Sequence, residues 1–468
     1  MEINFALLQK YNPWWEEKNL IQKDERILNF EKQAIKYFPR FLEREKFEIG
    51  VYTLIGPRQV GKSTALKLFV RDLLFKKKIE ASHIFFFQCD IIDHYQDLIQ
   101  VLEVYLQSLD HTKEIYVFLD EISFVEEWPR AIKHLIDRGD LKKAIIFLTG
   151  SLSLQVKGGA ELLPGRRGKK EKQDFLLLPL DFSEYLAVQK LKGLSFNFNL
   201  LLEESPQKLV LNPVLNRIYS QKYKIEVLFK EYLLTGGFLL SLNEFKKTKK
   251  ISDNTFHLYW QWIKGDLLKI GRNENIFLEI IQETIKHLGS TLSYNDITKN
   301  TSVQSHLTTM DYLDLGQKLF LLNIFYNIDL AKRLPALRKQ KKVTFLDPFL
   351  FHLLNGQVWG GIDFFNTAKE AINQYFPAFI EGMAANYLKQ KFIRSGFYQN
   401  KGEIDFIGLD KKETFGFEVK ARTKIKEKEI EKLKKLNQFH RIMLISKNEF
   451  RESQGILIIP YWMLLLAD

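Results

Sequence analysis

A glycine-rich segment in the first quarter of the chain has the residue types that hold a phosphate chain. Residues 56–63 have the sequence GPRQVGKS, in which two glycines are separated by four residues and followed by a lysine and a serine. Glycines let successive backbone N–H groups face a phosphate, lysine reaches its oxygens, and the serine hydroxyl ligates Mg²⁺. The pattern predicts an ATP site formed by Gly56, Pro57, Arg58, Gln59, Val60, Gly61, Lys62, Ser63 and Thr64.

An acidic pair at the end of an apolar run supplies the second half of such a site. Residues 115–119 are apolar at every position and are followed by Asp120 and Glu121. We expect Asp120 to hold Mg²⁺ through water and Glu121 to orient or deprotonate the attacking water. A solvated turn is the usual explanation of an acidic pair, but after a phosphate loop the pair predicts hydrolysis of ATP, with Mg²⁺ as cofactor.

A third apolar run places hydroxyl groups near the same site. Residues 144–148 are followed by Thr149, Gly150 and Ser151. The hydroxyls of Thr149 and Ser151 are candidate sensors of the γ-phosphate. Thr-Gly-Ser is also ordinary turn chemistry, so the sequence leaves both explanations open.

Two carboxylates and a lysine form a second candidate site near the C-terminus. In the run 415–420, FGFEVK, period-two alternation places Glu418 and Lys420 on one face. Asp405 lies between apolar residues of the preceding run and alternates in the same way. Two carboxylates can hold Mg²⁺ or Mn²⁺, and a lysine beside them can orient a water that attacks a phosphodiester. A cross-strand ion pair is the alternative explanation.

The elements around the first site have the pattern of an α/β domain. Runs that are apolar at every position are typical of parallel strands covered on both faces. Such runs alternate with amphipathic segments at 51–55, 84–87, 115–119 and 145–148. We therefore predict an α/β fold with a mostly parallel sheet for residues 49–190. Residues 1–48 are predicted to be an N-terminal helical extension that acts as a lid or docking helix.

The rest of the chain is predicted to form three units. Residues 191–275 have the pattern of a helical lid or linker region. Residues 276–362 place three short helices before two apolar runs, which is the plan of a winged helix. Its wing would be the basic loop that contains Lys332, Arg333, Arg338, Lys339, Lys341 and Lys342. Residues 363–468 are predicted to be an α/β domain that carries the second site.

Seven short segments carry a resemblance to a known family. They are NPWW at 12–15, GPRQVGKST at 56–64, FLDEIS at 118–123, LTGSLS at 148–153, LPGRRG at 163–168 with LLPLDFSEYL at 177–186, and LLTGGF at 233–238. Together they resemble the prokaryotic AAA+ type ATPases that carry a C-terminal domain related to PD-(D/E)XK nucleases. The resemblance runs almost end to end.

This resemblance implies the fold class and several further residues. It implies a P-loop NTPase core of the AAA+ type with strand order 5-1-4-3-2, a winged helix, and a restriction-endonuclease-like α/β domain. It implies a homo-oligomer in which an arginine from a neighbouring subunit completes the ATP site, and the candidates are Arg138, Arg166 and Arg167. Glu381 matches the further acidic residue of the nuclease-like site, so the predicted metal ligands there are Glu381, Asp405 and Glu418.

The composition favours a soluble, multidomain protein with an anionic partner. Lys and Arg number 69 against 57 Asp and Glu, which gives a formal net charge of +12 and favours DNA. The single cysteine, Cys89, lies beside an apolar run and is predicted to be a buried thiol in a reducing compartment. The chain shows no signal pattern and no apolar stretch that could span a bilayer, so we expect a cytoplasmic protein.

Two functions remain open at this point. The first is an ATP-hydrolysing protein that acts on DNA, in which ATP binding controls a metal-dependent nuclease domain. Its catalytic residues would be Glu121 in the ATPase and Asp405, Glu418 and Lys420 in the nuclease. The alternative is a nucleotide-operated switch or assembly ATPase whose nuclease-like domain is a non-cleaving module that docks on DNA or protein.

Overall fold

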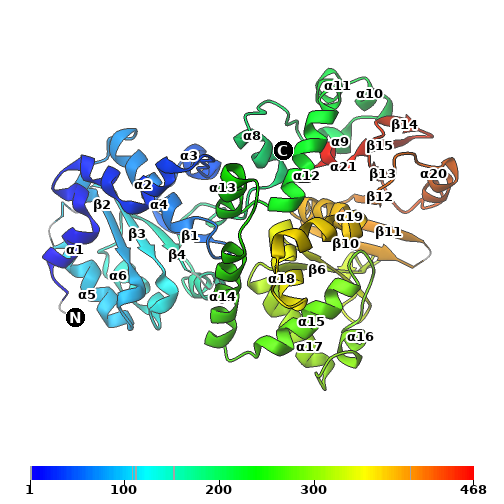
Figure 1. Cartoon of the computed structure of the whole chain (residues 1–468). Helices are drawn as coiled ribbons and strands as arrows, with labels where there is room; N and C mark the ends of the chain where they lie inside the picture. The colour runs from blue at the N-terminus through cyan, green and yellow to red at the C-terminus, as the bar shows by residue number, and fades with distance from the viewer. Residues whose placement is uncertain (1–2, 108, 111–112, 151–152, 401) are drawn as a thin grey trace. The chain divides into compact units, whose positions relative to one another are not determined.

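The chain folds into two compact units, residues 1–178 and residues 179–468 (Figure 1). The computed structural model describes residues 3–107, 109–110, 113–150, 153–400 and 402–468. Within these ranges, every helix is too short or too polar to cross a membrane.

The first unit is built on a five-stranded sheet in the order β2-β3-β4-β1-β5. Every neighbouring pair is parallel. The strands are β1 (Gly50–Ile55), β2 (Ile84–Gln88), β3 (Ile115–Asp120), β4 (Ala144–Thr149) and β5 (Asp174–Leu176). The predicted parallel sheet and its order 5-1-4-3-2 are therefore confirmed.

Helices cover both faces of this sheet, which explains why its strands are apolar throughout. The helices are α4 (Lys62–Phe75), α5 (Tyr95–Leu106), α6 (Trp128–Arg138) and α7 (Ser153–Glu161). The buried residues of α4 belong to one core, and those of α5, α6 and α7 belong to the other. In α6, the buried Trp128, Ala131, Ile132 and Leu135 have the three- and four-residue spacing of a helix with one apolar face.

The N-terminal segment covers the exposed edge of β2 instead of forming one lid helix. It consists of α1 (Phe5–Tyr11), η1 (Pro13–Trp15), η2 (Lys18–Lys23), α2 (Glu25–Lys32) and α3 (Arg40–Arg44). The Asn12 amide donates to Phe86 O at 3.0 Å and accepts from Phe86 N at 2.7 Å. The indoles of Trp14 and Trp15 both donate to Ile84 O, at 3.1 and 3.0 Å. These side chains replace the neighbouring strand that an edge strand lacks.

The second unit begins with helices that lead to two glycines. They are α8 (Phe182–Val188), α9 (Asn199–Glu203), α10 (Pro206–Val210), α11 (Pro213–Ser220) and α12 (Lys222–Thr235). At Gly237, an added Cβ would lie 2.0 Å from Leu180 O, so only glycine allows this close approach. The predicted break after Thr235 is confirmed, and α13 (Leu239–Thr248) and α14 (Asp253–Lys269) follow it.

The region predicted as a winged helix contains three helices and an antiparallel strand pair. The helices are α15 (Glu274–Lys286), α16 (Tyr294–Lys299) and α17 (His306–Lys318), and α18 (Pro348–Val358) follows the strands. The strands are β6 (Leu322–Tyr326), β7 (Ile328–Asp329), β8 (Leu334–Pro335) and β9 (Lys341–Phe345). The β6 and β9 strands pair with each other.

Two lysines of the predicted wing are buried, so their assignment to a DNA-facing wing is wrong. Lys341 and Lys342 begin β9 and are only 3% and 6% exposed. The sequence suggested a solvated loop because no apolar residue lies between Leu337 and the two lysines, and most of the residues there are basic. In the structure, the pairing of β9 with β6 carries both lysines into the interior.

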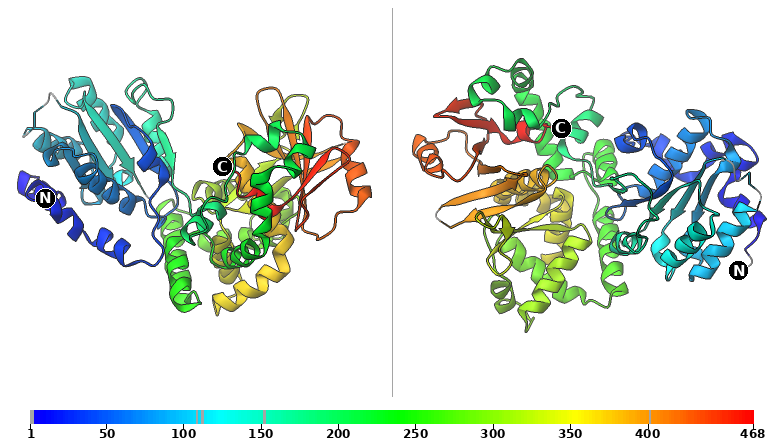
Figure 2. Two further views of the ribbon diagram at one scale, coloured as in Figure 1. Left: turned by 90° about the horizontal axis from the view of Figure 1, so that it is seen from above. Right: turned by 180° about the vertical axis from the view of Figure 1, so that it is seen from behind.

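A six-stranded mixed sheet closes the chain. Its order is β10-β11-β12-β13-β15-β14. The strands are β10 (Arg394–Gln399), β11 (Glu403–Leu409), β12 (Thr414–Lys420), β13 (Arg441–Ser446), β14 (Arg451–Ser453) and β15 (Ile456–Pro460). The accompanying helices are α19 (Phe364–Lys389), α20 (Glu427–Lys434) and α21 (Tyr461–Leu464). Helix α10 packs beside β14 and β15, although more than 200 residues separate them in the chain (Figure 2).

Candidate functional site

The phosphate-binding pattern lies between the end of β1 and the start of α4, as predicted. An added Cβ at Gly56 would lie 1.9 Å from Leu177 O, so the loop cannot accept a larger residue there. Gly61 has φ +98° and is the N-cap of α4, a conformation that favours glycine. Both glycines are therefore required by the backbone path. The loop ends at a helix N-terminus, which attracts anions.

Lys62 points its ammonium group back at the loop. Its Nζ donates to Gly56 O at 3.0 Å and to Pro57 O at 2.9 Å. The side chain is buried, and these carbonyl oxygens accept hydrogen bonds from its amino group. Phosphate oxygens are stronger acceptors for an ammonium than neutral carbonyls are. Lys62 is thus placed to exchange the two carbonyls for a phosphate.

Asp120 lies at the end of β3 and is fully buried. Its Oδ1 accepts a hydrogen bond from Thr149 Oγ1 at 2.5 Å. Its Oδ2 has no hydrogen-bond partner among the described residues. A buried carboxylate oxygen without a partner costs free energy, so the site fits a cation or its bound water at this atom. Ser63 and Asp120 are the residues of this loop and strand that would hold Mg²⁺.

Glu121 directly follows β3, and Thr149 is the last residue of the neighbouring strand β4. Glu121 has φ +56°, a conformation uncommon for a residue other than glycine. Its backbone N donates to Thr149 Oγ1 at 3.4 Å. The Thr149 hydroxyl therefore contacts both acidic positions, a role that the sequence did not indicate. Its predicted function as a γ-phosphate sensor stays a prediction, and Ser151 lies outside the described residues.

The three candidate arginine fingers all form ion pairs within the first unit. Each is held by at least one carboxylate: Arg138 by Glu103 at 2.6 Å and by Asp140, Arg166 by Asp137 at 2.6 Å, and Arg167 by Asp174 at 2.6 Å. Arg167 is the most buried of them, and its partner Asp174 also accepts from Thr53 Oγ1 at 2.5 Å. The choice between the three stays a prediction.

The structure brings together the acidic residues predicted for the C-terminal site. Glu381 comes from α19, Asp405 from β11 and Glu418 from β12. We call these three residues the carboxylate cluster. Asp405 N donates to Glu418 Oε2 at 3.2 Å, and Val419 N donates to Asp405 Oδ2 at 2.9 Å. Lys420 Nζ donates to Glu418 Oε1 at 2.6 Å.

A lysine that the sequence did not point to joins this cluster. Lys342 Nζ lies 2.8 Å from Glu381 Oε1 and 2.9 Å from Asp405 Oδ1. Lys342 belongs to β9 and lies 39 residues before Glu381 and 63 residues before Asp405 in the chain. The only sequence signal is the alternation of β9, which places the neighbouring residues Lys341 and Lys342 on opposite faces.

Burial and mutual repulsion raise the pKa of two carboxylates of the cluster. Burial, and then the charge of Asp405, raise the pKa of Glu381 and of Glu418 to about 7. Burial lowers the pKa of Lys342, but Asp405 and Glu381 outweigh it and the net pKa is raised. The site therefore holds Lys342 as a charged ammonium at neutral pH.

The carboxylate cluster does not fit a divalent metal in this arrangement. Among the described residues, no group of three or more His, Cys, Asp or Glu side chains has the geometry to hold a metal ion. Both oxygens of Asp405 and of Glu418 already accept hydrogen bonds from N–H groups of the chain. The predicted Mg²⁺ or Mn²⁺ ligands are thus close together but engaged with internal donors.

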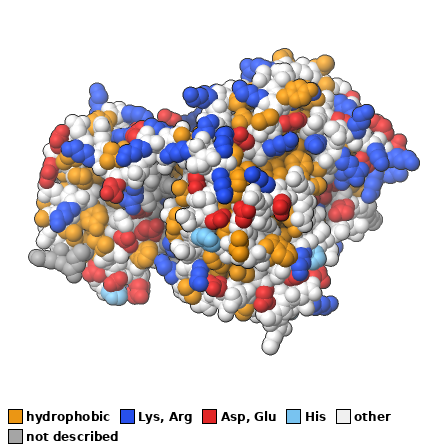
Figure 3. All heavy atoms as spheres, in the orientation of Figure 1, with side chains coloured by type: hydrophobic (Ala, Val, Ile, Leu, Met, Phe, Trp, Pro, Cys, Tyr) orange, Lys and Arg blue, Asp and Glu red, His pale blue; other side chains and the backbone are white. Residues whose placement is uncertain are grey.

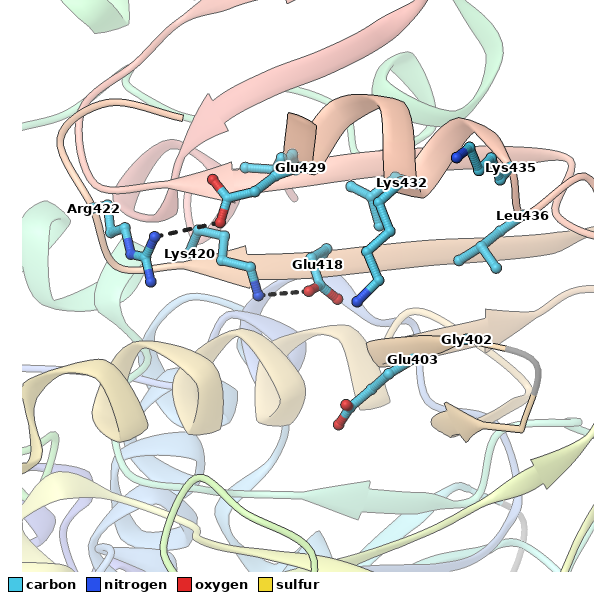
Figure 4. Close-up of a pocket in the computed structure, with 11 residues that line it drawn as sticks. Gly402, Glu403, Glu418, Lys420, Arg422, Glu429, Lys432, Lys435 and Leu436 are labelled. Carbon is cyan, nitrogen blue, oxygen red and sulfur yellow. Dashed lines mark hydrogen bonds and ion pairs between the residues drawn. The ribbon is translucent and has the colours of Figure 1, made fainter. Parts of the chain in front are cut away.

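A cavity of about 440 Å³ opens beside Glu418 and Lys420. Figure 4 shows it between α20 and the strands β11 and β12. Its charged lining residues are Lys420, Arg422, Lys432, Lys435, Glu403, Glu418 and Glu429, and its apolar ones include Leu433, Leu436 and Leu444. Four basic and three acidic side chains thus line the cavity, and Lys420 pairs with Glu418 while Arg422 pairs with Glu429.

Two family models match the chain. Residues 49–186 match a family described as an AAA domain, and residues 226–358 match a domain of unknown function (DUF8612). Residues 49–186, which include the parallel sheet and the loop at Lys62, are therefore similar to AAA domains. No curated protein matches the chain.

Several solved structures are similar to this chain over most of its length. A Walker-type ATPase of Pyrococcus abyssi has 14% identity and a TM-score of 0.37, covering 75% of this chain and 97% of its own. The ORC2 protein of Aeropyrum pernix, in ADPNP–ADP complexes, has 10% identity and a TM-score of 0.34, covering 75% and 95%. The ORC1 protein of Aeropyrum pernix, in complex with DNA, has 11% identity and a TM-score of 0.27, covering 74% and 96%. Because all three TM-scores are below 0.5, we draw no conclusion on fold or function from these similarities.

Proposed function

We propose that this chain hydrolyses ATP and that its nucleotide state controls how residues 179–468 engage DNA. The observation that supports ATP hydrolysis is the buried Asp120. Its Oδ2 has no hydrogen-bond partner in the described chain, while its Oδ1 accepts a hydrogen bond from Thr149. A residue held in this way beside a phosphate loop is prepared to receive a cation. The match of residues 49–186 to the AAA domain supports the same function.

Each residue of the site has a defined task in this proposal. Lys62 exchanges the carbonyls of Gly56 and Pro57 for oxygens of the β- and γ-phosphates. Ser63 and Asp120 hold Mg²⁺, which neutralises charge on these phosphates. Glu121 accepts a proton from the water that attacks the γ-phosphate.

Two substitutions separate binding from hydrolysis. Lys62→Ala should abolish ATP binding, whereas Glu121→Gln should bind ATP and lose turnover by at least about a hundredfold. The matched controls are Lys46→Ala and Glu43→Gln, which change exposed residues of the same unit. Calorimetry with ATP and steady-state phosphate release measure the two effects. Full turnover in Glu121→Gln would show that another residue is the base.

We further propose that the ATP site is completed in a cytoplasmic homo-oligomer. Arg138, Arg166 or Arg167 would leave its ion pair and contact the γ-phosphate of a neighbouring subunit. Mixing Glu121→Gln subunits with an arginine-to-alanine variant tests this. In a mixed oligomer, a site on an arginine-variant subunit has its own Glu121 and receives the arginine of a neighbouring Glu121→Gln subunit, so it should regain turnover. A mixture without any regained turnover, for each of the three variants, contradicts the proposal.

A basic surface on α20 and the residues that flank it supports DNA as the partner. It consists of Arg422, Lys424, Lys426, Lys428, Lys432, Lys434 and Lys435, all exposed. Only Glu427, Glu429 and Glu431 oppose them within residues 422–435. Figure 3 shows the Lys and Arg side chains gathered over this helix. A concentration of positive charge of this kind binds phosphate backbones and releases their counterions.

Neutralising part of this surface tests DNA binding. The triple variant Lys428→Ala/Lys432→Ala/Lys435→Ala should bind duplex DNA at least about tenfold more weakly, with a smaller dependence on salt. The control is Lys224→Ala/Lys230→Ala/Lys247→Ala, which removes the same charge from exposed positions elsewhere in the unit. Equal losses in both triple variants would reduce the effect to net charge and contradict docking at α20.

Metal-dependent DNA cleavage is the competing function for the same region. The approach of Asp405 and Glu418 to each other and of Lys420 to Glu418 favours it. We propose docking without cleavage, because two ammonium groups already form ion pairs with the three carboxylates of the cluster. Incubation of duplex, single-stranded and branched DNA with Mg²⁺ or Mn²⁺ decides between them. Cleavage that Asp405→Ala and Lys420→Ala both abolish would establish the nuclease.

A further inference from the structure

Lys342 occupies the space between two of the carboxylates that a metal would need. Its Nζ lies 2.8 Å from Glu381 Oε1 and 2.9 Å from Asp405 Oδ1. The side chains of Lys342, Glu381 and Asp405 are only 8%, 18% and 13% exposed. An ion pair this deep contributes little if the charges are removed together, but losing one partner leaves a buried charge uncompensated.

The position of Lys342 follows from the backbone of β9. In the register of the β6–β9 pair, Lys342 lies opposite Phe325 and Lys341 opposite Tyr326. Neighbouring residues of a strand face opposite sides. Accordingly, Lys341 lies over the ring of Tyr294, 4.0 Å from its centroid, while Lys342 reaches the carboxylates. The strand pairing therefore fixes which of the two lysines enters the cluster.

A divalent metal and this ammonium group cannot share the cluster. Mg²⁺ binds carboxylate oxygens at about 2.0–2.1 Å, so an ion on the oxygens that Lys342 contacts would lie only about 3.5–4.5 Å from its ammonium. Repulsion between the two cations at that distance is strong in a site with little water. A metal could therefore enter only if Lys342 left, which would bury an ammonium elsewhere or expose it.

We infer that Lys342 is the resident cation of the carboxylate cluster and stands in the place of a divalent metal. Removal of its charge then releases Glu381 Oε1 and Asp405 Oδ1 as ligands for a divalent metal, with Glu418 beside them. This inference rests on the proposed docking function and deepens it, since it gives the reason why DNA held near Lys420 is not cut. Lys420, which donates to Glu418 Oε1 and lines the cavity, remains available to contact a phosphate.

Mn²⁺ binding to the nucleotide-free full-length protein tests the inference. Electron paramagnetic resonance of free Mn²⁺ gives the amount bound, and thermal unfolding with and without Mn²⁺ gives a second readout. The wild type and Asp405→Asn should bind the same amount of Mn²⁺. Lys342→Met should bind one Mn²⁺ at least about tenfold more tightly and gain thermal stability from it. Lys342→Met/Asp405→Asn should lose both effects.

Two lysine variants serve as controls. Lys342→Arg keeps the positive charge and should behave like the wild type. Lys341→Met removes a neighbouring buried ammonium from the opposite face of β9 and should also gain no Mn²⁺. If Lys342→Met does not fold, Lys342→Met/Glu381→Gln removes one of the two carboxylates left without a partner and still offers Asp405 Oδ1 to the metal.

Two results would overturn the inference. One is Mn²⁺ bound by the wild type and lost in Asp405→Asn. The other is a folded Lys342 variant that gains no Mn²⁺. Neither depends on DNA, so both differ from failure of the docking function, which is an unchanged DNA affinity in the triple variant of α20. ATP turnover by residues 1–178 provides a check that the variants are otherwise intact.

Discussion

At the scale of single residues, the Thr149 hydroxyl connects the Asp120 carboxylate with the backbone of Glu121. It donates to Asp120 Oδ1 at 2.5 Å and accepts from Glu121 N at 3.4 Å. A hydrogen bond to a charged group is about twice as strong as one between neutral groups. Thr149 is therefore a positioning residue for Asp120, independent of any contact that it makes with nucleotide.

Thr149→Val removes this hydrogen bond and keeps the side-chain shape. We expect kcat for ATP hydrolysis to fall by about tenfold or more, because the bond contributes roughly 1.5–3 kcal/mol to holding Asp120. ATP affinity should change much less, and Thr149→Ser should restore most of kcat. A Thr149→Val enzyme with unaltered kcat, measured by phosphate release, would rule out the positioning role.

The two sites differ in how far single residues could be predicted. Period-two alternation was enough to place Glu418 with Lys420 and to bring Asp405 to them. Lys342 could not be found in this way, because it reaches the cluster through the pairing of β9 with β6 and nothing local marks it as buried. Partners that come from distant elements depend on tertiary packing, which a single sequence does not display.

At the scale of elements, Asn12 completes the edge of the first sheet. Its side-chain amide forms the two hydrogen bonds with Phe86 that a neighbouring strand would form with an edge residue. The sequence showed the NPWW segment as part of a family resemblance but gave no physical role for it. The sheet order supplies that role, because β2 lies at the edge.

Asn12→Ala should destabilise the first unit. It leaves the N–H and C=O of Phe86 without partners in a buried position, at a cost of roughly 1–3 kcal/mol for each group. We expect the free energy of unfolding to fall by about 2–4 kcal/mol, measured by chemical denaturation. Asn19→Ala changes an exposed asparagine of the same segment and should stay within about 0.5 kcal/mol of the wild type. Equal stability of the two variants would contradict this account of the edge.

Asp347 connects the two glycines after α12 to the start of α18. Its Oδ2 accepts from Gly237 N at 2.8 Å, and its Oδ1 accepts from Phe349 N at 2.8 Å as the N-cap of α18. An added Cβ at Gly236 would lie 2.0 Å from the same carboxylate. The glycine pair thus allows the chain to pass close to a buried acid.

The buried acid predicts a dependence of stability on pH. Burial raises the pKa of Asp347 to about 7, although the N–H groups of Gly237 and Phe349 oppose the shift. The folded state therefore holds the proton more tightly than the unfolded state, so stability falls as pH rises from about 4 to about 7. The wild type minus Asp347→Asn difference in unfolding free energy should shrink over this range. A difference that grows or stays constant would show that the carboxylate is ionised in the folded protein throughout.

At the scale of the whole molecule, our proposal assigns nucleotide chemistry to one unit and DNA contact to the other. The ATP site belongs entirely to residues 1–178, and the basic surface of α20 belongs to residues 179–468. The sheet order of the first unit followed from the family resemblance, and its apolar strands from residue patterns alone. How nucleotide state at Lys62 affects α20 is a property of the complete chain, which local patterns do not encode.

The measurement that tests the central claim most directly is the DNA affinity of Glu121→Gln in different nucleotide states. This variant should hold ATP without turnover, so fluorescence anisotropy of labelled duplex DNA can compare ATP–Mg²⁺ with ADP. We predict affinities that differ by about tenfold, within the usual range of coupling between two sites, and no difference in Lys62→Ala. Equal DNA affinity of Glu121→Gln with ATP and with ADP would contradict control of DNA engagement by nucleotide.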